Sequence, residues 1–335
     1  MNFNIFINRK QWEEFDEETM KVFKENIFKY YRENGFPYFN LSVKERQEDF
    51  IRLCNLDSNL MLEGNEINQI MTGLGFINHY MPHTFGMRSG NFKTPLESFM
   101  DDESLRMAID KQLKIGYYMS DTGMRKVLSF INGTQKISNF RPSVAKFIYD
   151  KFGGEHVLDF SSGFGGRIMG ACASSIKTYV GFEPCIETFK ALGEMAKDLK
   201  QISSIEEMIL INESFEDTEQ LEDNWADCAF SSPPYFNSEH YSDEENQSDV
   251  RYKTIKEWES KFLIPTIKKC KDALHNGGYF IINVANTRQH MKLEKNTYEY
   301  ALSSGFKYIT SYNMRISKFK DIWKTEPILI FKKES

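Results

Sequence analysis

A short proline-rich stretch, Ser232-Pro233-Pro234-Tyr235, holds the residues best suited to chemistry in this sequence. Two successive prolines exclude a helix and remove two backbone donors, so the chain here is stiff and extended. The stretch follows an apolar run, residues 225–230, which predicts a buried strand. The Ser232 hydroxyl and the Pro233 carbonyl can each accept an N–H bond, and the Tyr235 ring can stack on a flat group. The pattern predicts a clamp for a planar group that bears an amine.

A second stretch, upstream of the first, has the form of a ligand-binding glycine loop. Asp159 ends a short apolar run and is followed by Gly163, Gly165 and Gly166, after which a helix is predicted. The glycines permit a tight turn and the close approach of a ligand to the backbone. Glu183 ends the next predicted strand, at a spacing where a carboxylate can bind ribose hydroxyls. The loop therefore predicts a nucleotide-like cofactor; an NAD enzyme would also fit it but would leave the proline-rich stretch unexplained.

Short apolar strands alternate with helices through the later part of the chain, which predicts an α/β fold with a doubly wound, mostly parallel sheet. Both stretches follow predicted strands, and ligands of such sheets bind beyond the carboxyl ends of the strands. Residues 1–135 lack this alternation, so we expect a helical amino-terminal region over 1–135 and a catalytic domain over 136–335. The predicted strands span residues 157–160, 179–182, 208–211, 228–230 and 279–284, with a closing antiparallel pair at 308–314 and 328–331, and the predicted helices include 143–152, 167–174, 186–199 and 258–274.

Composition and charge exclude several classes of protein. The 335 residues carry a formal net charge of -6, which counts against a protein that coats nucleic acid irrespective of its sequence. The five cysteines form no CxxC pair, so neither a zinc site nor a disulfide framework is predicted, and a cytoplasmic location is expected. No apolar run approaches the ~18–20 residues that span a bilayer, so we expect no membrane association. His79 and His83 have the spacing of metal ligands on a helix, but Pro82 between them argues against a helix, so we expect no metal.

The glycine loop and its surroundings resemble the class I S-adenosylmethionine-dependent methyltransferases over residues 140–333. The resemblance implies a Rossmann-like fold with S-adenosyl-L-methionine as the cofactor. It further implies that Asp159 lies near the methionine part of the cofactor and that Glu183 holds the ribose. Amino-methyltransferases of this class often have phenylalanine where this chain has Ser161, so the methionine end would be lined differently. The other implied contacts are Gly163, Gly165 and Gly166 beneath the cofactor, one or more of Glu213, Ser214 and Phe215 at the adenine, and Arg141 and Pro142 at the methionine end.

The proline-rich stretch resembles the Asp/Asn/Ser-Pro-Pro-Tyr motif of DNA amino-methyltransferases. That resemblance implies methyl transfer to an exocyclic amine of a base flipped out of duplex DNA, with Ser232, Pro233, Pro234 and Tyr235 as the catalytic residues. Serine in the first position is, within the family, more typical of cytosine N4 than of adenine N6. Many cytosine-N4 enzymes place the two motifs in the opposite order, however. Cytosine N4 is the favoured target and adenine N6 the first alternative.

Two further functions stay open as alternatives. Related motifs serve in methyltransferases that act on amines of RNA or of protein factors. A methyltransferase fold can also serve as a non-catalytic DNA-binding subunit, although the intact Asp159, Glu183 and proline-rich stretch disfavour this. For a DNA methyltransferase we expect DNA as the partner, a restriction-modification setting with a cognate restriction nuclease, and a target-recognition role for residues 1–135.

The residues after the proline-rich stretch supply candidates for substrate binding. Phe236 can extend the stacking surface, and Arg251 and Lys253 can contact phosphates. The polar residues 237–250 between them predict a loop that faces the substrate, with a solvated surface loop as the equal alternative. His240 lies in this loop close to the clamp and is a substrate-side candidate, although a single histidine is more often structural than catalytic.

Overall fold

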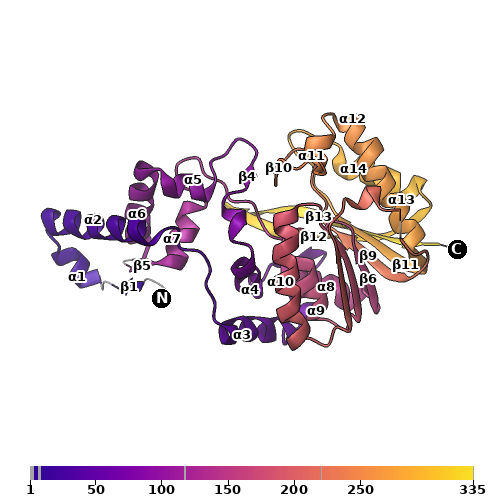
Figure 1. The fold of residues 1–335 in the computed structure, drawn as a ribbon, viewed down its shortest axis with the longest axis horizontal. Coiled ribbons are helices and arrows are strands. Elements are labelled where there is room, and N and C mark those ends of the chain that lie inside the picture. Colours follow the sequence, from indigo (N-terminus) through magenta and orange to yellow (C-terminus); the bar gives the residue numbers. More distant parts are fainter. Residues whose placement is uncertain (1–3, 7–8, 117, 220, 335) are drawn as a thin grey trace. The chain divides into compact units, whose positions relative to one another are not determined.

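The computed structural model describes residues 4–6, 9–116, 118–219 and 221–334, which form two compact units (Figure 1). The first unit comprises residues 1–40 and 82–138, and the second comprises residues 41–81 and 139–335. This division differs from the expected one in residues 41–81, which belong to the unit predicted to be catalytic. They do so because their apolar side chains, such as Phe50 and Phe76, share its hydrophobic core.

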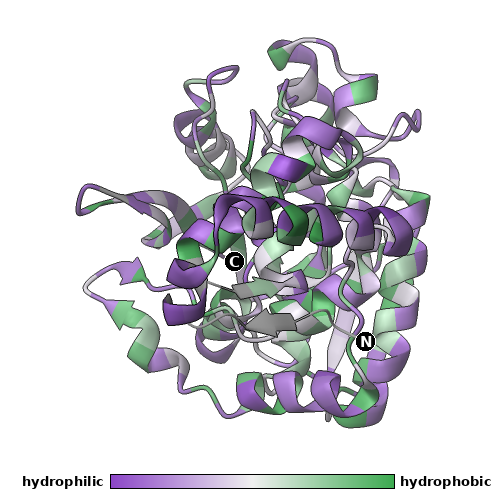
Figure 2. Cartoon of the chain, turned by 90° about the vertical axis from the view of Figure 1, so that its left-hand side faces the viewer, coloured by the Kyte–Doolittle hydropathy of each residue, from purple (hydrophilic) through white to green (hydrophobic). Residues whose placement is uncertain are grey.

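The first unit is mainly helical, as its sequence pattern predicts. Its longest helix, α2 (Glu17–Asn34), begins after Asp16, whose carboxylate accepts a hydrogen bond from the Thr19 N–H at 2.7 Å. Ile27 and Tyr31 are buried among apolar residues of the same unit. The apolar and polar sides of the helices can be followed in Figure 2. The other elements of this unit are β1 (Asn4–Phe6), α1 (Arg9–Glu14), η2 (Pro82–Phe85), β4 (Arg88–Ser89), α5 (Pro95–Met100), α6 (Asp102–Gly116), β5 (Tyr118–Ser120) and α7 (Asp121–Leu128).

The second unit is built on a sheet whose nine described strands lie in the order β2-β3-β12-β13-β11-β9-β6-β7-β8. The strands from β11 to β8 are parallel, and β13 and β12 follow β11 as an antiparallel hairpin, so the predicted fold class is confirmed. The chain runs from β6 through β7 to β8 on one side and then returns to β9 on the other side of β6. The strand order reverses between β6 and β9, and such a switch point is where these sheets bind ligands. The strands are β2 (Leu62–Glu63), β3 (Glu66–Ile67), β6 (His156–Asp159), β7 (Thr178–Phe182), β8 (Glu207–Ile211), β9 (Ala226–Ser231), β11 (Leu274–Asn283), β12 (Phe306–Phe319) and β13 (Ile322–Lys333).

Helices pack on both faces of the central part of this sheet, and successive side chains along each strand point to opposite faces. Val157 of β6 lies in one core with α8 and α10, whereas its neighbour Leu158 lies in a second core with α13 and α14. Tyr179 and Val180 of β7 divide in the same way. The helices and remaining elements of the unit are α3 (Val43–Cys54), η1 (Ser58–Met61), α4 (Leu74–Tyr80), α8 (Pro142–Phe152), α9 (Gly166–Cys172), α10 (Ile186–Ile202), η3 (Phe215–Asp217), β10 (Glu239–His240), α11 (Ser248–Arg251), α12 (Ile255–Trp258), η4 (Glu259–Leu263), α13 (Ile264–Ala273) and α14 (Leu293–Ser303).

The helix predicted over residues 258–274 takes a more irregular form. It consists of α12, the π-helical segment η4 and α13, with Pro265 in the first turn of α13. Proline cannot donate to the preceding turn, and the wider π-helical hydrogen-bonding pattern immediately before it accommodates that loss. The fifth parallel strand, β11, begins before the predicted position, and its register with β9 shifts between Leu274 and Tyr279.

Candidate active site

The glycine loop lies at the carboxyl end of β6 and leads into α9, as predicted. Gly163 and Gly165 have φ values of 55° and 86°, in the left-handed region that favours glycine. A Cβ atom on Gly163 would meet no atom closer than 3.9 Å, so this glycine borders open space. A Cβ atom on Gly165 would lie 2.3 Å from Met195 Cε, and one on Gly166 would lie 2.1 Å from the Phe140 carbonyl oxygen. Gly163 is therefore free to approach a ligand, whereas Gly165 is favoured by its left-handed conformation and Gly166 by its packing against the backbone of Phe140.

We expect Gly166→Ala to lower the free energy of unfolding by about 1–3 kcal/mol, because the added methyl group would overlap a backbone carbonyl that cannot move away cheaply. The matched control is Gly193→Ala in α10, where a Cβ meets nothing within 4 Å and alanine gains helix propensity of up to ~1 kcal/mol. Denaturant unfolding of both variants checks the prediction. Equal stabilities for the two variants would contradict it.

Asp159 is fully buried, and both of its carboxylate oxygens accept hydrogen bonds from other residues of the protein. Its Oδ2 accepts from Arg167 Nε at 2.9 Å and from the Tyr179 hydroxyl at 2.6 Å. Its Oδ1 accepts from Ser231 Oγ at 2.8 Å and from the Ser161 N–H at 3.3 Å. Arg167 is itself only 3% exposed, so the two charges form a buried ion pair. Asp159 thus fixes the shape of the loop that would surround the methionine part of the cofactor.

Three members of this network, Arg167, Tyr179 and Ser231, are not among the predicted site residues. Arg167 directly follows the loop glycines, and a cation at that position next to a buried acid is a signal that could have been used. Tyr179 and Ser231 carry no such signal, because they are brought to Asp159 by strand pairing. β7 and β9 flank β6 in the sheet, which places their residues on either side of Asp159.

Glu183 follows β7 and its carboxylate contacts the glycine loop. Oε2 accepts from the Gly163 N–H at 2.9 Å, and Oε1 accepts from the Cys185 N–H at 2.9 Å. The residue is 8% exposed, and burial raises the pKa of Glu183 to about 8, against the lowering effect of the two N–H bonds. The structure therefore places Glu183, the residue predicted to bind the ribose, beside Gly163 of the glycine loop.

The pKa of Glu183 gives a testable dependence of stability on pH. Because the folded chain binds this proton more tightly than the unfolded chain, the contribution of Glu183 to stability is present below pH ~4.5 and is lost as the pH rises toward 8. The slope is at most about 1.4 kcal/mol per pH unit. We expect Glu183→Gln to remove this component from the pH dependence of the unfolding free energy between pH 5 and 8. An unchanged slope in chemical denaturation would refute the prediction.

The proline-rich stretch begins at the carboxyl end of β9, next to the end of β6. Ser231, the residue before it, donates to Asp159 and also lies 3.1 Å from the Ser161 carbonyl oxygen. Ser232 Oγ lies 3.2 Å from Asn283 Oδ1 and 3.3 Å from the Tyr235 hydroxyl. The Tyr235 hydroxyl donates to Asn283 Oδ1 at 3.0 Å. The residue that precedes the predicted clamp is thus hydrogen-bonded to the predicted cofactor loop, at neighbouring strand ends.

The three candidates for adenine contact have different environments. Phe215 is 2% exposed and packs in the core beside Phe160 and Phe182, so its ring faces other aromatic rings. Ser214 is buried and donates to the Asn246 carbonyl oxygen at 2.8 Å. Glu213 is partly exposed, which leaves it as the one of the three with a side chain accessible to a ligand in the described structure.

Arg141 and Pro142 lie at the start of α8. Pro142 is buried as the first residue of the helix and lies against Gly73. Arg141 donates to Gln69 Oε1 at 3.0 Å and to the Asn139 carbonyl oxygen at 2.7 Å, and burial lowers its pKa. Arg141 is partly buried, and the two acceptors of its hydrogen bonds in the described structure, Gln69 and the Asn139 carbonyl, are neutral. An anionic group of a ligand would supply the missing charge.

The substrate-side candidates are held mainly by contacts within the protein. Phe236 is 6% exposed, has a φ of 56° and packs against Trp258, so its ring belongs to the core. His240 Nδ1 lies 2.7 Å from Asp249 Oδ2, and Nε2 lies 3.1 Å from Asp243 Oδ1. These two carboxylates raise the pKa of His240. Arg251 pairs with Asp217 and Glu216, and Lys253 Nζ donates to the Asp249 carbonyl oxygen at 3.3 Å. Lys253 and Arg251 are the exposed members of these four, and Arg251 is the one held by carboxylates.

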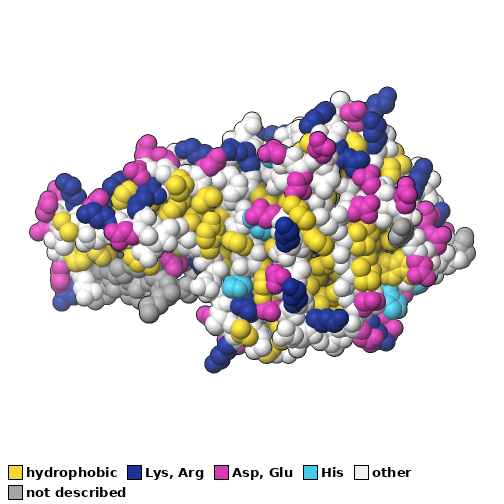
Figure 3. Space-filling model, viewed as in Figure 1, with side chains coloured by type: hydrophobic (Ala, Val, Ile, Leu, Met, Phe, Trp, Pro, Cys, Tyr) yellow, Lys and Arg dark blue, Asp and Glu magenta, His cyan; other side chains and the backbone are white. Residues whose placement is uncertain are grey.

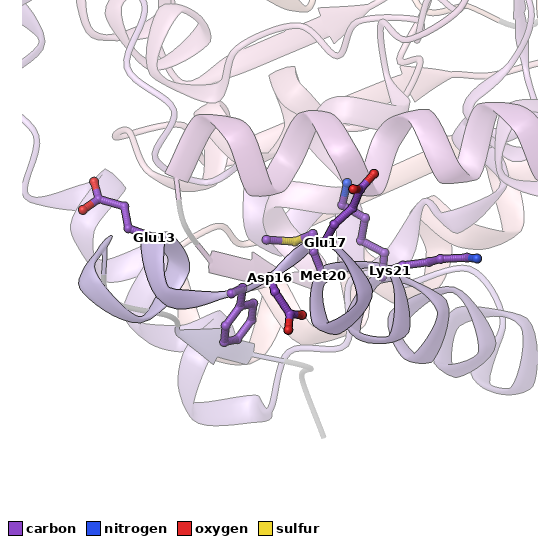
Figure 4. A pocket seen from close by; sticks show the side chains of 7 residues that line it. Glu13, Asp16, Glu17, Met20 and Lys21 are labelled. Atoms are coloured by element: carbon purple, nitrogen blue, oxygen red, sulfur yellow. The ribbon is translucent and has the colours of Figure 1, made fainter.

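Two further features of the described structure are its surface charge and a pocket that lies apart from the predicted site residues. Basic and acidic side chains are interspersed on the face drawn in Figure 3. Within the described ranges, no group of three or more His, Cys, Asp or Glu side chains could hold a metal, and no helix is long and apolar enough to cross a membrane. A pocket at the junction of α1 and α2 in the first unit is shown in Figure 4; it includes none of the predicted site residues and is lined by Glu13, Phe15, Asp16, Glu17, Met20, Lys21 and Lys24.

The strand order and the antiparallel last hairpin of the second unit define the class I methyltransferase fold. No protein-family model matches the chain, and no curated protein matches it. Solved structures with a similar fold include an S-adenosylmethionine-dependent O-methyltransferase from Thermotoga maritima, at 14% identity over 60% of this chain and 68% of that chain with a TM-score of 0.39. M. jannaschii TYW2 in complex with AdoMet matches at 18% identity over 59% and 79% of the two chains, with a TM-score of 0.39. The tRNA (m1A58) methyltransferase TrmI from Aquifex aeolicus matches at 13% identity over 60% and 72%, also with a TM-score of 0.39.

Proposed function

We propose that this chain transfers a methyl group from S-adenosylmethionine to the exocyclic amine of a nucleobase. The observation that carries the proposal is the hydrogen bond from Ser231 Oγ to Asp159 Oδ1, at 2.8 Å. This bond joins the residue before the amine clamp to the first residue of the cofactor loop. A methyl donor at the loop and an amine at Ser232 would then meet at adjacent strand ends, and such positioning supplies a large part of the catalysis of a two-substrate transfer.

The residues around the loop fit S-adenosylmethionine. Gly163 borders open space in a conformation that brings backbone close to a ligand, and the Glu183 carboxylate beside it can accept ribose hydroxyls. Arg141, whose two hydrogen-bond acceptors in the described structure are neutral, suits the carboxylate of the cofactor's methionine part, and Glu213 is the accessible residue for the adenine. When bound, the cofactor supplies a methyl group made electrophilic by a sulfonium.

The chain's own residues act on the amine. An exocyclic amine is a poor nucleophile because its lone pair is delocalised into the ring. Ser232 Oγ and the Pro233 carbonyl would accept its two N–H bonds, favour a tetrahedral nitrogen and direct the lone pair toward the methyl group. No strong general base is needed before transfer, because the proton becomes acidic once the nitrogen is alkylated. The Tyr235 ring, fixed through its hydroxyl by Asn283, would stack on the base.

Cytosine N4 in DNA is the target that the serine of the clamp favours, with adenine N6 as the alternative. RNA is the second candidate substrate: a tRNA methyltransferase is among the structures of similar fold, and the two residues expected to contact DNA phosphates do not form an open basic surface, since Arg251 is paired with acids. We assign target recognition to the first unit. A cognate nuclease and a cytoplasmic location belong to the same proposal.

The experiment that tests this function is an incubation of the protein with methyl-labelled cofactor and, in competition, DNA of varied sequence, total RNA and protein extract. The nucleic acids are then digested to nucleosides and the label is identified. We expect label in N4-methylcytosine from DNA. Label in methylated RNA nucleosides alone would move the substrate to RNA, and label in no amine of any substrate would refute the proposed function.

A further inference from the structure

We propose that Asn283 is a positioning residue that makes the Ser232 hydroxyl an acceptor for the substrate amine; this inference rests on the function proposed above. β9 and β11 are parallel and in register, with Ser231 opposite Ile282. The residues that follow, Ser232 and Asn283, are therefore neighbours at the carboxyl edge of the sheet. Asn283 is 1% exposed, so the hydrogen bonds of its amide must come from the protein.

The orientation of the Asn283 amide is fixed by Pro327 on β13. Nδ2 lies 2.9 Å from the Pro327 carbonyl oxygen, which can accept a hydrogen bond but cannot donate one. The amino group must therefore face Pro327, and the carbonyl oxygen Oδ1 must face the opposite way, toward the Ser232 and Tyr235 hydroxyls. The antiparallel pairing of Asn283 with Ile328 holds the two strands in this relation.

The hydrogen-bond distances indicate where the two hydroxyl protons go. Oδ1 lies 3.0 Å from the Tyr235 hydroxyl oxygen and 3.2 Å from Ser232 Oγ, and an amide oxygen has lone pairs for both. The competing contacts are longer: 3.3 Å between the two hydroxyl oxygens and 3.5 Å from the Tyr235 hydroxyl to Glu326 Oε2. Both hydroxyls thus donate to Asn283, and Ser232 Oγ keeps its lone pairs for other donors.

This direction matters for the chemistry of the amine. A serine hydroxyl that donated its proton to the amine nitrogen would occupy the electron pair that must attack the methyl group. A serine whose only proton is committed to Asn283 can act solely as an acceptor, and it then draws an amine N–H toward itself and leaves the nitrogen lone pair free. Asn283 therefore acts through Ser232 and touches neither the base nor the cofactor.

A double-mutant cycle between Asn283→Leu and Ser232→Ala tests this assignment. We expect Asn283→Leu to lower kcat at least tenfold while the Kd for S-adenosylmethionine stays within twofold of the wild type. The cycle is run in a Tyr235→Phe background, which removes the other hydroxyl that Asn283 holds. There the Asn283→Leu/Ser232→Ala variant should be no slower than Ser232→Ala, because Asn283 has nothing left to act through. The control is Asn276→Leu, the same replacement at an exposed position of the same strand, which should leave kcat unchanged. Rate losses that multiply in the double variant would overturn the assignment.

Two further measurements keep the result decisive. Asn283→Asp keeps an acceptor oxygen toward Ser232 but sets its second oxygen against the Pro327 carbonyl, so we expect its kcat to lie between those of the wild type and Asn283→Leu. A kcat no higher than that of Asn283→Leu would contradict an acceptor role. The same cycle is also followed by denaturant unfolding, where the decreases in the folding equilibrium constant should be less than multiplicative. If the wild type methylates no amine, the proposed function fails, and the unfolding cycle alone decides whether Asn283 holds the Ser232 hydroxyl.

Discussion

Replacing Ser232 by alanine is expected to lower kcat by about 100-fold or more, equivalent to about 2.7 kcal/mol of transition-state stabilisation. The Ser232 oxygen is the side-chain acceptor of the proposed amine clamp, and its lone pairs matter most when the nitrogen becomes tetrahedral. The variant removes a single atom from a partly exposed position, so the loss should not reflect unfolding. The measurement is methyl transfer in single-turnover conditions, with the Kd for S-adenosylmethionine determined in parallel by calorimetry.

The affinity for the cofactor distinguishes this effect from general damage to the site. We expect the Kd of Ser232→Ala to match that of the wild type, because Ser231 and not Ser232 is bonded to Asp159. Ser203→Ala is the matched control: its hydroxyl donates to the Leu199 carbonyl oxygen at the end of α10, and its loss should leave kcat unchanged. A Ser232→Ala enzyme with full activity would remove Ser232 from the mechanism.

The largest effect on stability is expected for Arg167→Met. This replacement leaves the fully buried Asp159 carboxylate without its cation, and breaking one side of a buried ion pair typically costs about 3–5 kcal/mol of unfolding free energy. Arg167 also donates to the Ser161 carbonyl oxygen, so the glycine loop loses a second anchor. We therefore expect a lower midpoint in denaturant unfolding together with weaker binding of the cofactor.

An exposed ion pair of the same unit provides the comparison. On α10, Lys197 Nζ lies 2.6 Å from Glu194 Oε1, and the two side chains are 68% and 66% exposed. Lys197→Met should change the unfolding free energy by about 1 kcal/mol or less, because water screens such pairs. If Arg167→Met were no more destabilising than Lys197→Met, the buried network around Asp159 would not be what holds the loop.

The order of strands and helices in the second unit could be read from the sequence because local signals agree with the tertiary structure there. Four of the five parallel strands contain short apolar runs that are buried on both faces, the edge strand β8 being partly exposed, and each strand is followed by a turn or a helix start. Residues 41–81 show the limit of this approach. Helix α3 is recognisable from its Ser42 cap, but the core that buries its apolar face is contributed by residues distant in the chain. No local pattern encodes that assignment.

The same limit applies within the site. Sequence alone selected the proline-rich stretch, the glycine loop and Glu183, since proline, glycine and a strand-terminal acid each constrain the backbone or the chemistry locally. It also selected Phe215 and Phe236, whose rings the fold buries in the core. Local pattern cannot distinguish an aromatic ring that faces a ligand from one that packs against other rings, because both follow a strand end.

What the sequence by itself determined is the set of residues that can act and the type of fold that carries them. Only the tertiary structure decided how they act together: Ser231 is joined to Asp159, and Ser232 is joined to Asn283, over separations of 72 and 51 residues. These links depend on β9 lying between β6 and β11 in the sheet. Strand neighbours are chosen by long-range packing, so the direction of a single hydroxyl proton at the amine clamp is a property of the folded sheet and not of the motif.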